Sequence, residues 1–178
     1  MGEQACVQCL HGRGVATGLD EPGAEFEFVG AHPQNGVVEF TRHGERVYAP
    51  RDAFDSLDAR PWATGLIYPV ISLRDPLTHA LSRQLLLGDS PTTAQIDRRS
   101  AELHVDASTT PAFLCHALDD TAVPVENSLR MLASMREAQR PVEAHLLQEG
   151  GHAFGVGRPG TPSAQWIDLY CAWLDRTS

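Results

Sequence analysis

Three short apolar segments in the later part of the chain constrain its fold more than any other feature of the sequence. They cover residues 63–72 (ATGLIYPVIS), 111–118 (PAFLCHAL) and 141–147 (PVEAHLL). The first two runs are largely apolar, which is typical of strands buried on both faces of a sheet, and the third, which contains Glu143 and His145, predicts a further strand. Pro69 lies inside the first run. Because proline cannot donate to a sheet ladder, the first strand is expected to end near it.

Helical patterns separate the three predicted strands and follow the last of them. Residues 77–87 and 92–99 each predict a short helix, and Gly88 stops the first. Two longer segments carry apolar residues at helical spacing on one face. These residues are Val125, Leu129, Leu132 and Met135 in segment 124–139, and Trp166, Ile167, Tyr170, Trp173 and Leu174 in segment 163–174. Strands and helices in alternation predict an α/β fold in which helices flank a parallel sheet.

The N-terminal part of the chain lacks this order and is expected to form a separate segment. Glycine is frequent there, and the apolar residues follow no sustained period. Residues 24–29 and 36–40 alternate well enough to predict two short strands, joined as a hairpin around residues 33–36. The sequence therefore predicts an irregular or hairpin-containing segment at residues 1–47, followed by the α/β part at residues 48–178.

The charge and hydropathy of the chain argue against several kinds of partner. The net charge is −9 and the isoelectric point is near 5.2, so no broad basic face is expected for nucleic acid or an anionic membrane. The sequence has no apolar run of about 18 residues, the length that crosses a bilayer. Its first residues also lack the basic and apolar regions of a secretory signal. A cytoplasmic location is the default expectation.

The four cysteines are too few and too dispersed to predict a disulfide framework. Cys115 and Cys171 lie in apolar runs, which is typical of small buried side chains. Cys6 and Cys9 form a C-x-x-C pair with His11 nearby, a pattern found in metal and redox sites. Because the chain offers neither a second pair at zinc-site spacing nor a thioredoxin-like context, we predict no metal and no cofactor.

Ionisable side chains follow two of the predicted strands, at the edge where open parallel sheets bind their ligands. Asp119 and Asp120 come directly after the second strand, and His152 comes after the third, preceded by two glycines. An acid and then a histidine in this chain order is typical of the second half of a hydrolase triad. In such a triad the acid orients the imidazole, and the imidazole acts as the base.

The stretch from residue 114 to residue 154 resembles a known enzyme family. The matching pieces are residues 120–124 (DTAVP), 127–128 (NS) and 150–154 (GGHAF), with 48–50 (YAP) and 66–72 (LIYPVIS) upstream. They are similar to motifs of α/β-hydrolase-fold esterases of the acetyl-esterase and dienelactone-hydrolase-like family, over roughly the last two-thirds of the chain. The resemblance implies that Asp120 is the catalytic acid and His152 the catalytic base. Asp119 would then be a solvated or helix-capping carboxylate.

The nucleophile of that family is missing from the sequence. Family members place a serine in the motif G-x-S-x-G, which occurs nowhere in this chain. Residues 11–19 (HGRGVATGL) resemble the glycine-rich start of the helix after that serine, which would put Cys9 beside the serine's position. The chain therefore reads as truncated or rearranged before about residue 48. If it is active, Cys9, Ser72 and Ser128 are the candidate nucleophiles.

Four further histidines and two tryptophans are predicted to be structural. His116 lies inside a predicted strand and is expected to be a buried, hydrogen-bonded ring. Trp166 and Trp173 are expected to pack in the core rather than to line a substrate platform. Three further histidines, His79, His104 and His145, are expected at the surface or at helix caps.

Together these observations predict a carboxylic-ester hydrolase of the acetyl-esterase type that uses Asp120 and His152 with an unidentified nucleophile. A small ester or an acetylated carbohydrate is the substrate that the resemblance implies. Two alternatives stay open: an inactive hydrolase remnant that serves binding or assembly, and a serine peptidase of the prolyl-oligopeptidase type. Without its usual neighbouring strands the sheet would expose an apolar edge, so either self-association, as in a homo-oligomer, or poor solubility is expected, with residues 20–47 as a segment that could fold over that edge.

Overall fold

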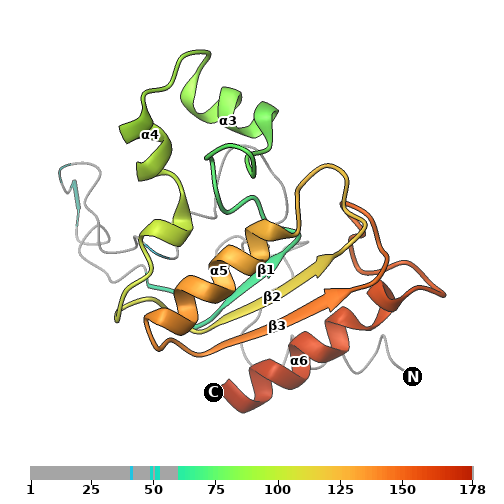
Figure 1. The fold of residues 1–178 in the computed structure, drawn as a ribbon. Coiled ribbons are helices and arrows are strands. Elements are labelled where there is room, and N and C mark those ends of the chain that lie inside the picture. The colour runs from blue at the N-terminus through green and yellow to red at the C-terminus, as the bar shows by residue number, and fades with distance from the viewer. Residues whose placement is uncertain (1–40, 42–48, 50, 53–59, 178) are drawn as a thin grey trace.

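The computed structural model describes residues 60–177, together with residues 41, 49, 51 and 52. Within these residues three strands form one parallel sheet in the order β1-β2-β3 (Figure 1). The strands are β1 (Thr64–Ile67), β2 (Ala112–Ala117) and β3 (Val142–Leu147). The predicted α/β fold with a parallel sheet is confirmed. The hairpin expected within residues 24–40 and the boundary expected at residue 47 lie outside the described residues.

Strand β1 is shorter than the apolar run that predicted it. It begins in register with β2, with Thr64 opposite Ala112, but ends at Ile67, opposite Cys115. The next residue, Tyr68, has a positive φ of 44°, which turns the chain out of the sheet before Pro69. Strands β2 and β3 stay paired to their ends, where Ala117 lies opposite Leu147. The prediction that the first strand stops near Pro69 is therefore confirmed.

The helices lie close to their predicted positions. They are α3 (Ala80–Leu87), α4 (Thr93–Arg98), α5 (Glu126–Glu137) and α6 (Trp166–Thr177), with short 3-10 turns η2 (Ala101–Leu103) and η3 (Pro162–Gln165). His79 caps α3, because its side chain accepts a hydrogen bond from the backbone N–H of Ser82, and Gly88 ends this helix at φ 80°. Thr92 and Gln95 form a capping box at the start of α4.

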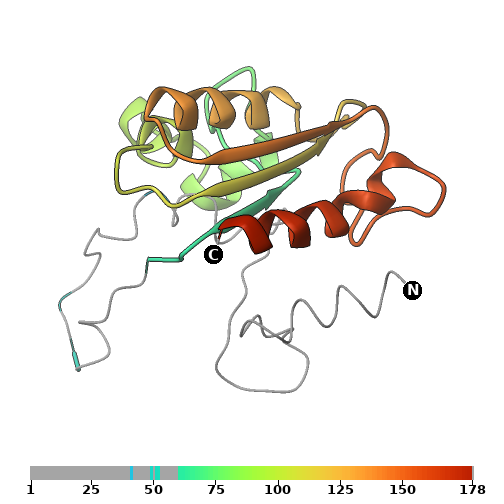
Figure 2. The same ribbon diagram turned by 90° about the horizontal axis from the view of Figure 1, so that it is seen from below.

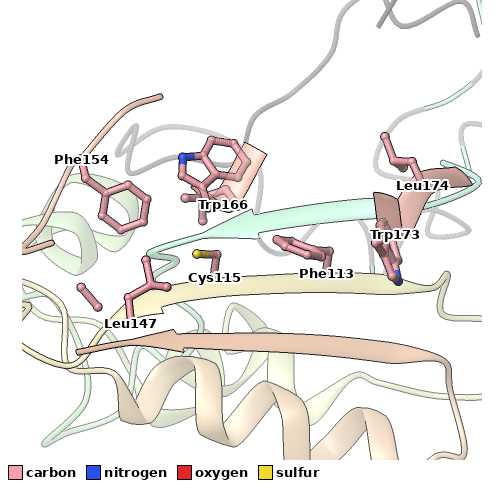
Figure 3. Packing of buried hydrophobic residues seen from close by; sticks show 9 residues of the cluster. Phe113, Cys115, Leu147, Phe154, Trp166, Trp173 and Leu174 are labelled. Atoms are coloured by element: carbon pink, nitrogen blue, oxygen red, sulfur yellow. The ribbon is translucent and has the colours of Figure 1, made fainter. Parts of the chain in front are cut away.

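Helices α5 and α6 cover opposite faces of the sheet (Figure 2). Successive side chains of a strand point to opposite faces, so β2 contributes to two separate cores. The core on the α5 side contains Leu66, Ile71, Ala101, Ala112, Leu114, Met131 and Met135. The core on the α6 side contains Ile67, Phe113, Cys115, Ala117, Leu147, Phe154, Trp166, Trp173 and Leu174 (Figure 3). Every residue of β2 is buried, as its continuous apolar sequence predicts.

Aromatic side chains dominate the core on the α6 side. The ring of Phe113 lies 5.2 Å from that of Tyr170 and 5.7 Å from that of Trp173, measured between centroids. Trp166 and Trp173 are 3% and 5% exposed, which confirms the prediction that they pack in the core. Each such buried ring contributes about 1.5–3 kcal/mol relative to an exposed one. Among the described residues, no helix is both long and apolar enough to cross a membrane.

Candidate active site

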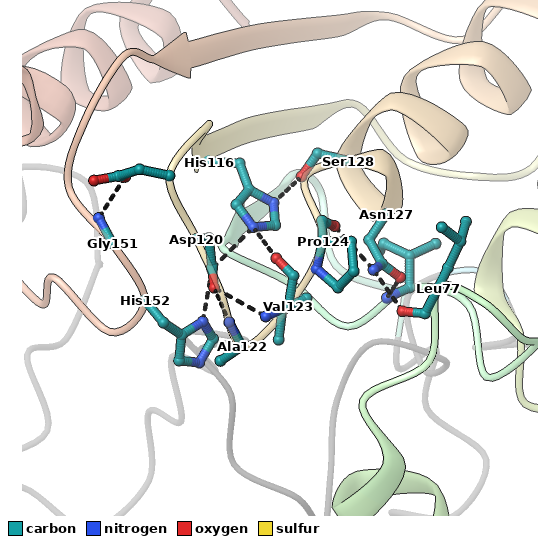
Figure 4. A network of polar contacts seen from close by, with 12 residues as sticks. Leu77, His116, Asp120, Ala122, Val123, Pro124, Asn127, Ser128, Gly151 and His152 are labelled. Atoms are coloured by element: carbon teal, nitrogen blue, oxygen red, sulfur yellow. Dashed lines mark hydrogen bonds and ion pairs between the residues drawn. The ribbon is translucent and has the colours of Figure 1, made fainter.

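The candidate site lies at one edge of the sheet, where β2 and β3 both end. Because the strands are parallel, the loops that follow them leave from the same edge. The N–H of Leu118 still donates to the carbonyl of Leu147 (2.7 Å), which holds the two loops together as they leave the sheet. Asp120 follows β2 by three residues and His152 follows β3 by five, so the two side chains meet above this edge (Figure 4).

The carboxylate of Asp120 is buried and accepts four hydrogen bonds. Its Oδ1 accepts from the backbone N–H groups of Ala122 and Val123, both at 2.9 Å. Its Oδ2 accepts from Nδ1 of His152 at 2.7 Å and from Nε2 of His116 at 3.1 Å. Burial by itself raises the pKa of Asp120, but the hydrogen bonds from Val123, His152 and Ala122 outweigh it and hold the pKa below its usual value. The carboxylate therefore stays ionised while fully shielded from water.

The hydrogen bond to Asp120 orients the ring of His152. A carboxylate oxygen can only accept, so Nδ1 carries a proton and Nε2 is the basic nitrogen of the neutral ring. Among the described residues no group forms a hydrogen bond with this Nε2, and the side chain is 22% exposed. Tyr68, which follows β1, packs edge-on against the His152 ring at 5.2 Å and against Phe154 at 4.7 Å, between centroids. All three strands thus contribute a residue to this site.

The loop that carries His152 is held by contacts to its backbone. Gly151 and Ala153, on either side of the histidine, have positive φ angles of 66° and 54°. Asp119 accepts a hydrogen bond from the N–H of Gly151 at 2.7 Å, and Arg158 donates to the carbonyl of His152 at 3.4 Å. The Gly151 N–H lowers the pKa of Asp119 below its usual value. Asp119 is exposed, in line with its prediction as a solvated carboxylate, and it also joins the loop after β2 to the loop after β3.

His116 is a buried, fully hydrogen-bonded ring, as predicted for a histidine inside a strand. Its side chain has no exposed surface. Nδ1 lies 2.8 Å from the hydroxyl of Ser128, and Nε2 lies 3.1 Å from both Asp120 Oδ2 and the carbonyl oxygen of Val123. Burial lowers the pKa of His116 below its usual value, although the neighbouring Asp120 charge opposes that shift. His116 therefore extends the polar network of the site into the core beneath it.

Asn127 fixes the start of α5 to the segment that follows β1. Its Oδ1 accepts from the N–H groups of Ile71 and Ser72 at 3.0 and 2.9 Å. Its Nδ2 donates to the carbonyls of Leu77 and Pro124 at 2.9 and 3.0 Å. Every donor and acceptor of this fully buried amide is therefore satisfied.

The candidate nucleophiles that the structure describes are engaged elsewhere. Ser128 bonds His116 rather than His152. Ser72 is 2% exposed, and its hydroxyl accepts from the N–H of Arg74 at 3.3 Å. Burial raises the pKa of the Cys115 thiol to about 12, so this thiol stays protonated and unreactive. Cys6, Cys9 and His11 lie outside the described residues.

The described residues hold no cluster of three or more histidine, cysteine, aspartate or glutamate side chains suited to a metal ion. The histidines expected at the surface or at caps are His79, His104 and His145. His79 caps α3, and His104 bonds the carbonyl of Asp97 at 2.9 Å. His145, half-buried on β3, bonds Glu143 at 2.9 Å and packs against Phe113 at 5.1 Å between centroids.

Sequence reasoning missed three contacts of this site: the Asp119–Gly151 bond, the Tyr68–His152 packing and the Ser128–His116 bond. The chain order of Asp119 and Gly151 carries no signal for a contact across 32 residues. In the sequence, Tyr68 was predicted only to belong to an apolar strand. Ser128 had a weak signal, because it belongs to the asparagine-serine pair of the family motif.

A parallel sheet covered by helices on both faces, with an acid and a histidine at its carboxyl edge, is an arrangement typical of α/β-hydrolases. The model of the prolyl oligopeptidase family matches residues 70–178, which is more than half of the chain. The protein belongs to this family. Asp120 and His152 both lie inside the matched region, and their catalytic roles remain predictions.

Several known proteins are similar to this chain. It is 32% identical over 114 residues to endo-1,4-beta-xylanase B of Butyrivibrio fibrisolvens, a match that covers 64% of this chain and 18% of that protein. It is 32% identical to the solved acetyl ester-xyloside bifunctional hydrolase of Caldicellulosiruptor lactoaceticus, with a TM-score of 0.69, covering 71% of this chain and 46% of that one. A carboxylesterase of Lactobacillus plantarum is 28% identical at a TM-score of 0.53, covering 69% and 48%. The chain thus spans less than half the length of these relatives.

Proposed function

We propose that the protein takes part in the hydrolysis of small carboxylic esters or acetylated carbohydrates, with His152 as the general base and Asp120 as its orienting acid. One observation carries the proposal: Oδ2 of Asp120 lies 2.7 Å from Nδ1 of His152, at the carboxyl edge of a parallel sheet. This contact leaves Nε2 of His152 free to take a proton from a nucleophile. The buried, ionised carboxylate stabilises the imidazolium that then forms.

The relatives support an ester rather than a peptide as the substrate. Two solved relatives above 25% identity are described as an acetyl ester-xyloside hydrolase and a carboxylesterase. A third relative is described as a xylanase, which favours an acetylated xylan fragment among acetylated carbohydrates. The prolyl oligopeptidase family match keeps a serine peptidase as the second candidate.

The nucleophile is the open part of this proposal. The sequence contains no G-x-S-x-G motif, and the hydroxyls of Ser72 and Ser128 are bonded away from His152. A triad without its serine retains only the residual catalysis of binding and the oxyanion hole, about 10³–10⁴ over water. We therefore propose that this chain by itself hydrolyses esters only slowly, with His152 acting as the base toward water. An inactive remnant with a binding or assembly role is the alternative that the missing motif favours.

Hydrolysis of p-nitrophenyl acetate by the purified chain tests the proposal. We expect a slow release of p-nitrophenol that falls to the background rate in His152→Ala. His104→Ala is the matched control, because His104 is a partly buried histidine that bonds a helix carbonyl away from the site. A rate that is equal in wild type and His152→Ala would contradict the proposed role of His152 and favour the inactive remnant. Fast, His152-dependent hydrolysis would instead show that a nucleophile is present, and Cys9→Ala, Ser72→Ala and Ser128→Ala would then locate it.

A further inference from the structure

Two histidines share one oxygen of the candidate acid. Oδ2 of Asp120 lies 2.7 Å from Nδ1 of His152 and 3.1 Å from Nε2 of His116 (Figure 4). A catalytic triad needs the contact with His152 and gives no role to the contact with His116. His116 lies on the central strand β2 and its side chain has no exposed surface, whereas His152 lies on a loop.

The partners of His116 fix its tautomer. Nε2 faces two groups that can only accept, the Asp120 carboxylate and the carbonyl of Val123, so Nε2 carries a proton. Nδ1 faces the hydroxyl of Ser128, which can donate to it at 2.8 Å. In the neutral ring both nitrogens are thereby satisfied by partners from the loop after β2 and from α5.

Burial favours the neutral form of the His116 ring. Among the described residues the titratable groups that face it are Asp120 and His152. The charge of Asp120 favours an imidazolium, but burial and a charged His152 oppose one, and the net effect is a lowered pKa for His116. His116 therefore acts toward Asp120 as a neutral hydrogen-bond donor and not as a counter-ion.

The hydrogen bond from Nε2 of His116 holds the second oxygen of the Asp120 carboxylate in place. The two backbone N–H groups hold Oδ1, but Oδ2 would otherwise be held by His152 alone. The ring of His152 stands on a loop and is 22% exposed, so it cannot orient its own partner rigidly. His116 contacts the same oxygen from the packed interior, where neighbouring side chains leave it no room to turn.

We propose that His116 is a positioning residue: together with Ser128 it fixes the orientation of Asp120 Oδ2, and through it the tautomer and ring orientation of His152. The inference rests on the proposed function for its catalytic meaning, because Asp120, which His116 orients, is the proposed acid of that site. The hydrogen-bond relay itself, from Ser128 through His116 and Asp120 to His152, can be tested without any turnover.

Nuclear magnetic resonance of the ¹⁵N-histidine-labelled full chain tests the tautomer first. At about pH 7 we expect a spectrum in which Nε2 of His116 is protonated, Nδ1 is not, and Nδ1 of His152 carries a slowly exchanging proton. A His116 that is protonated on Nδ1, or that is cationic at that pH, overturns the proposal. This measurement uses the unaltered protein, so it does not depend on how any variant folds.

Two substitutions then separate positioning from packing. His116→Leu removes the donor, and we expect the Nδ1 proton of His152 to exchange with water about tenfold faster. His116→Gln keeps a neutral N–H donor at a similar distance along the side chain, and we expect exchange close to the wild-type rate. A folded His116→Leu variant in which the exchange rate is unchanged overturns the proposal, as does a folded His116→Gln variant that behaves like His116→Leu.

These outcomes can be told apart from a failure of the proposed function. Absence of ester hydrolysis in the wild-type chain would leave the spectra unaffected and would refute only the catalytic reading. Unchanged spectra in both folded variants would refute the positioning role, even if His152-dependent ester hydrolysis were found.

Discussion

The two loops that build the candidate site are held in opposite ways. The acid loop, which follows β2 and carries Asp120, is held by buried contacts. The side chain of Asp120 has no exposed surface and accepts four hydrogen bonds. The histidine loop, which follows β3 and carries His152, is held by exposed contacts to its backbone. Asp119 accepts from the N–H of Gly151, and Arg158 donates to the carbonyl of His152. Beyond it the chain continues into exposed turns, where Val156 is 76% exposed.

This difference is consistent with the roles that we propose for Asp120 and His152. The acid must stay ionised in a place without water, and only a full set of hydrogen-bond donors offsets the cost of burying its charge. The proposed base has to reach a substrate, and the side chain of His152 is 22% exposed. The acid loop is therefore expected to be the more stable of the two, and the histidine loop the more adaptable.

The largest effect is expected from removal of the buried acid. Asp120→Ala leaves the rings of His116 and His152 and two backbone N–H groups without their acceptor. Breaking a buried pair in this way costs about 3 kcal/mol in the free energy of unfolding. Urea denaturation followed by circular dichroism measures this loss. Asp119→Ala is the matched control, because it removes an exposed carboxylate next in the chain, and an equal loss in both variants would contradict the contrast between the loops.

A smaller loss of stability is expected when the pH is lowered. The pKa of His116 is lowered by burial, so the unfolded chain binds the proton first and stability falls as the pH drops below about 6.5. Asp120 adds a second loss at lower pH: its pKa is held below 3.8, so its contribution is present above that value and disappears as the pH falls through the folded-state pKa. One proton changes stability by at most about 1.4 kcal/mol per pH unit.

Unfolding free energies at about pH 7 and about pH 5 check the first of these losses. The wild-type chain should lose stability over that interval, and His116→Gln should lose less, because its amide does not titrate. Equal losses in the two proteins would show that His116 does not stay neutral in the folded state.

The smallest effect is expected in the histidine loop. Gly151 has a φ of 66°, and a side chain there would meet the flexible end of Arg158 at 3.5 Å, so Gly151→Ala strains the backbone without a clash. The expected cost is about 1 kcal/mol. Gly155→Ala is the control, since Gly155 has a φ of 56° and open space around it.

Both glycine variants should unfold at similar denaturant concentrations, but only Gly151→Ala should speed the exchange of the Nδ1 proton of His152. If the two variants perturb His152 equally, the conformation of Gly151 does not matter to the site. If neither perturbs it, the histidine loop is as rigid as the acid loop.

The elements of the fold were largely visible in the sequence. Residues 111–118 and 141–147 are each bounded by proline and by turn residues, and both form strands close to these limits. The end of α3 at Gly88 and the start of α4 at Thr92 were readable from single residues. Segment 163–174 was predicted less well, because Pro162–Gln165 forms a 3-10 turn and α6 begins only at Trp166.

What the sequence determined by itself is the order of strands and helices and the positions of Asp120 and His152 at the ends of two adjacent strands. Those features depend on local periodicity and on motifs a few residues long. The tertiary structure alone decided that Asp119 accepts from Gly151, that His116 and His152 share one oxygen, and that Tyr68 packs on the histidine. A hydrogen bond requires two groups to meet within about 3 Å at a favourable angle. For groups on separate loops, that distance is set by strand register and by backbone angles such as the positive φ of Tyr68 and Gly151, which no local pattern specifies.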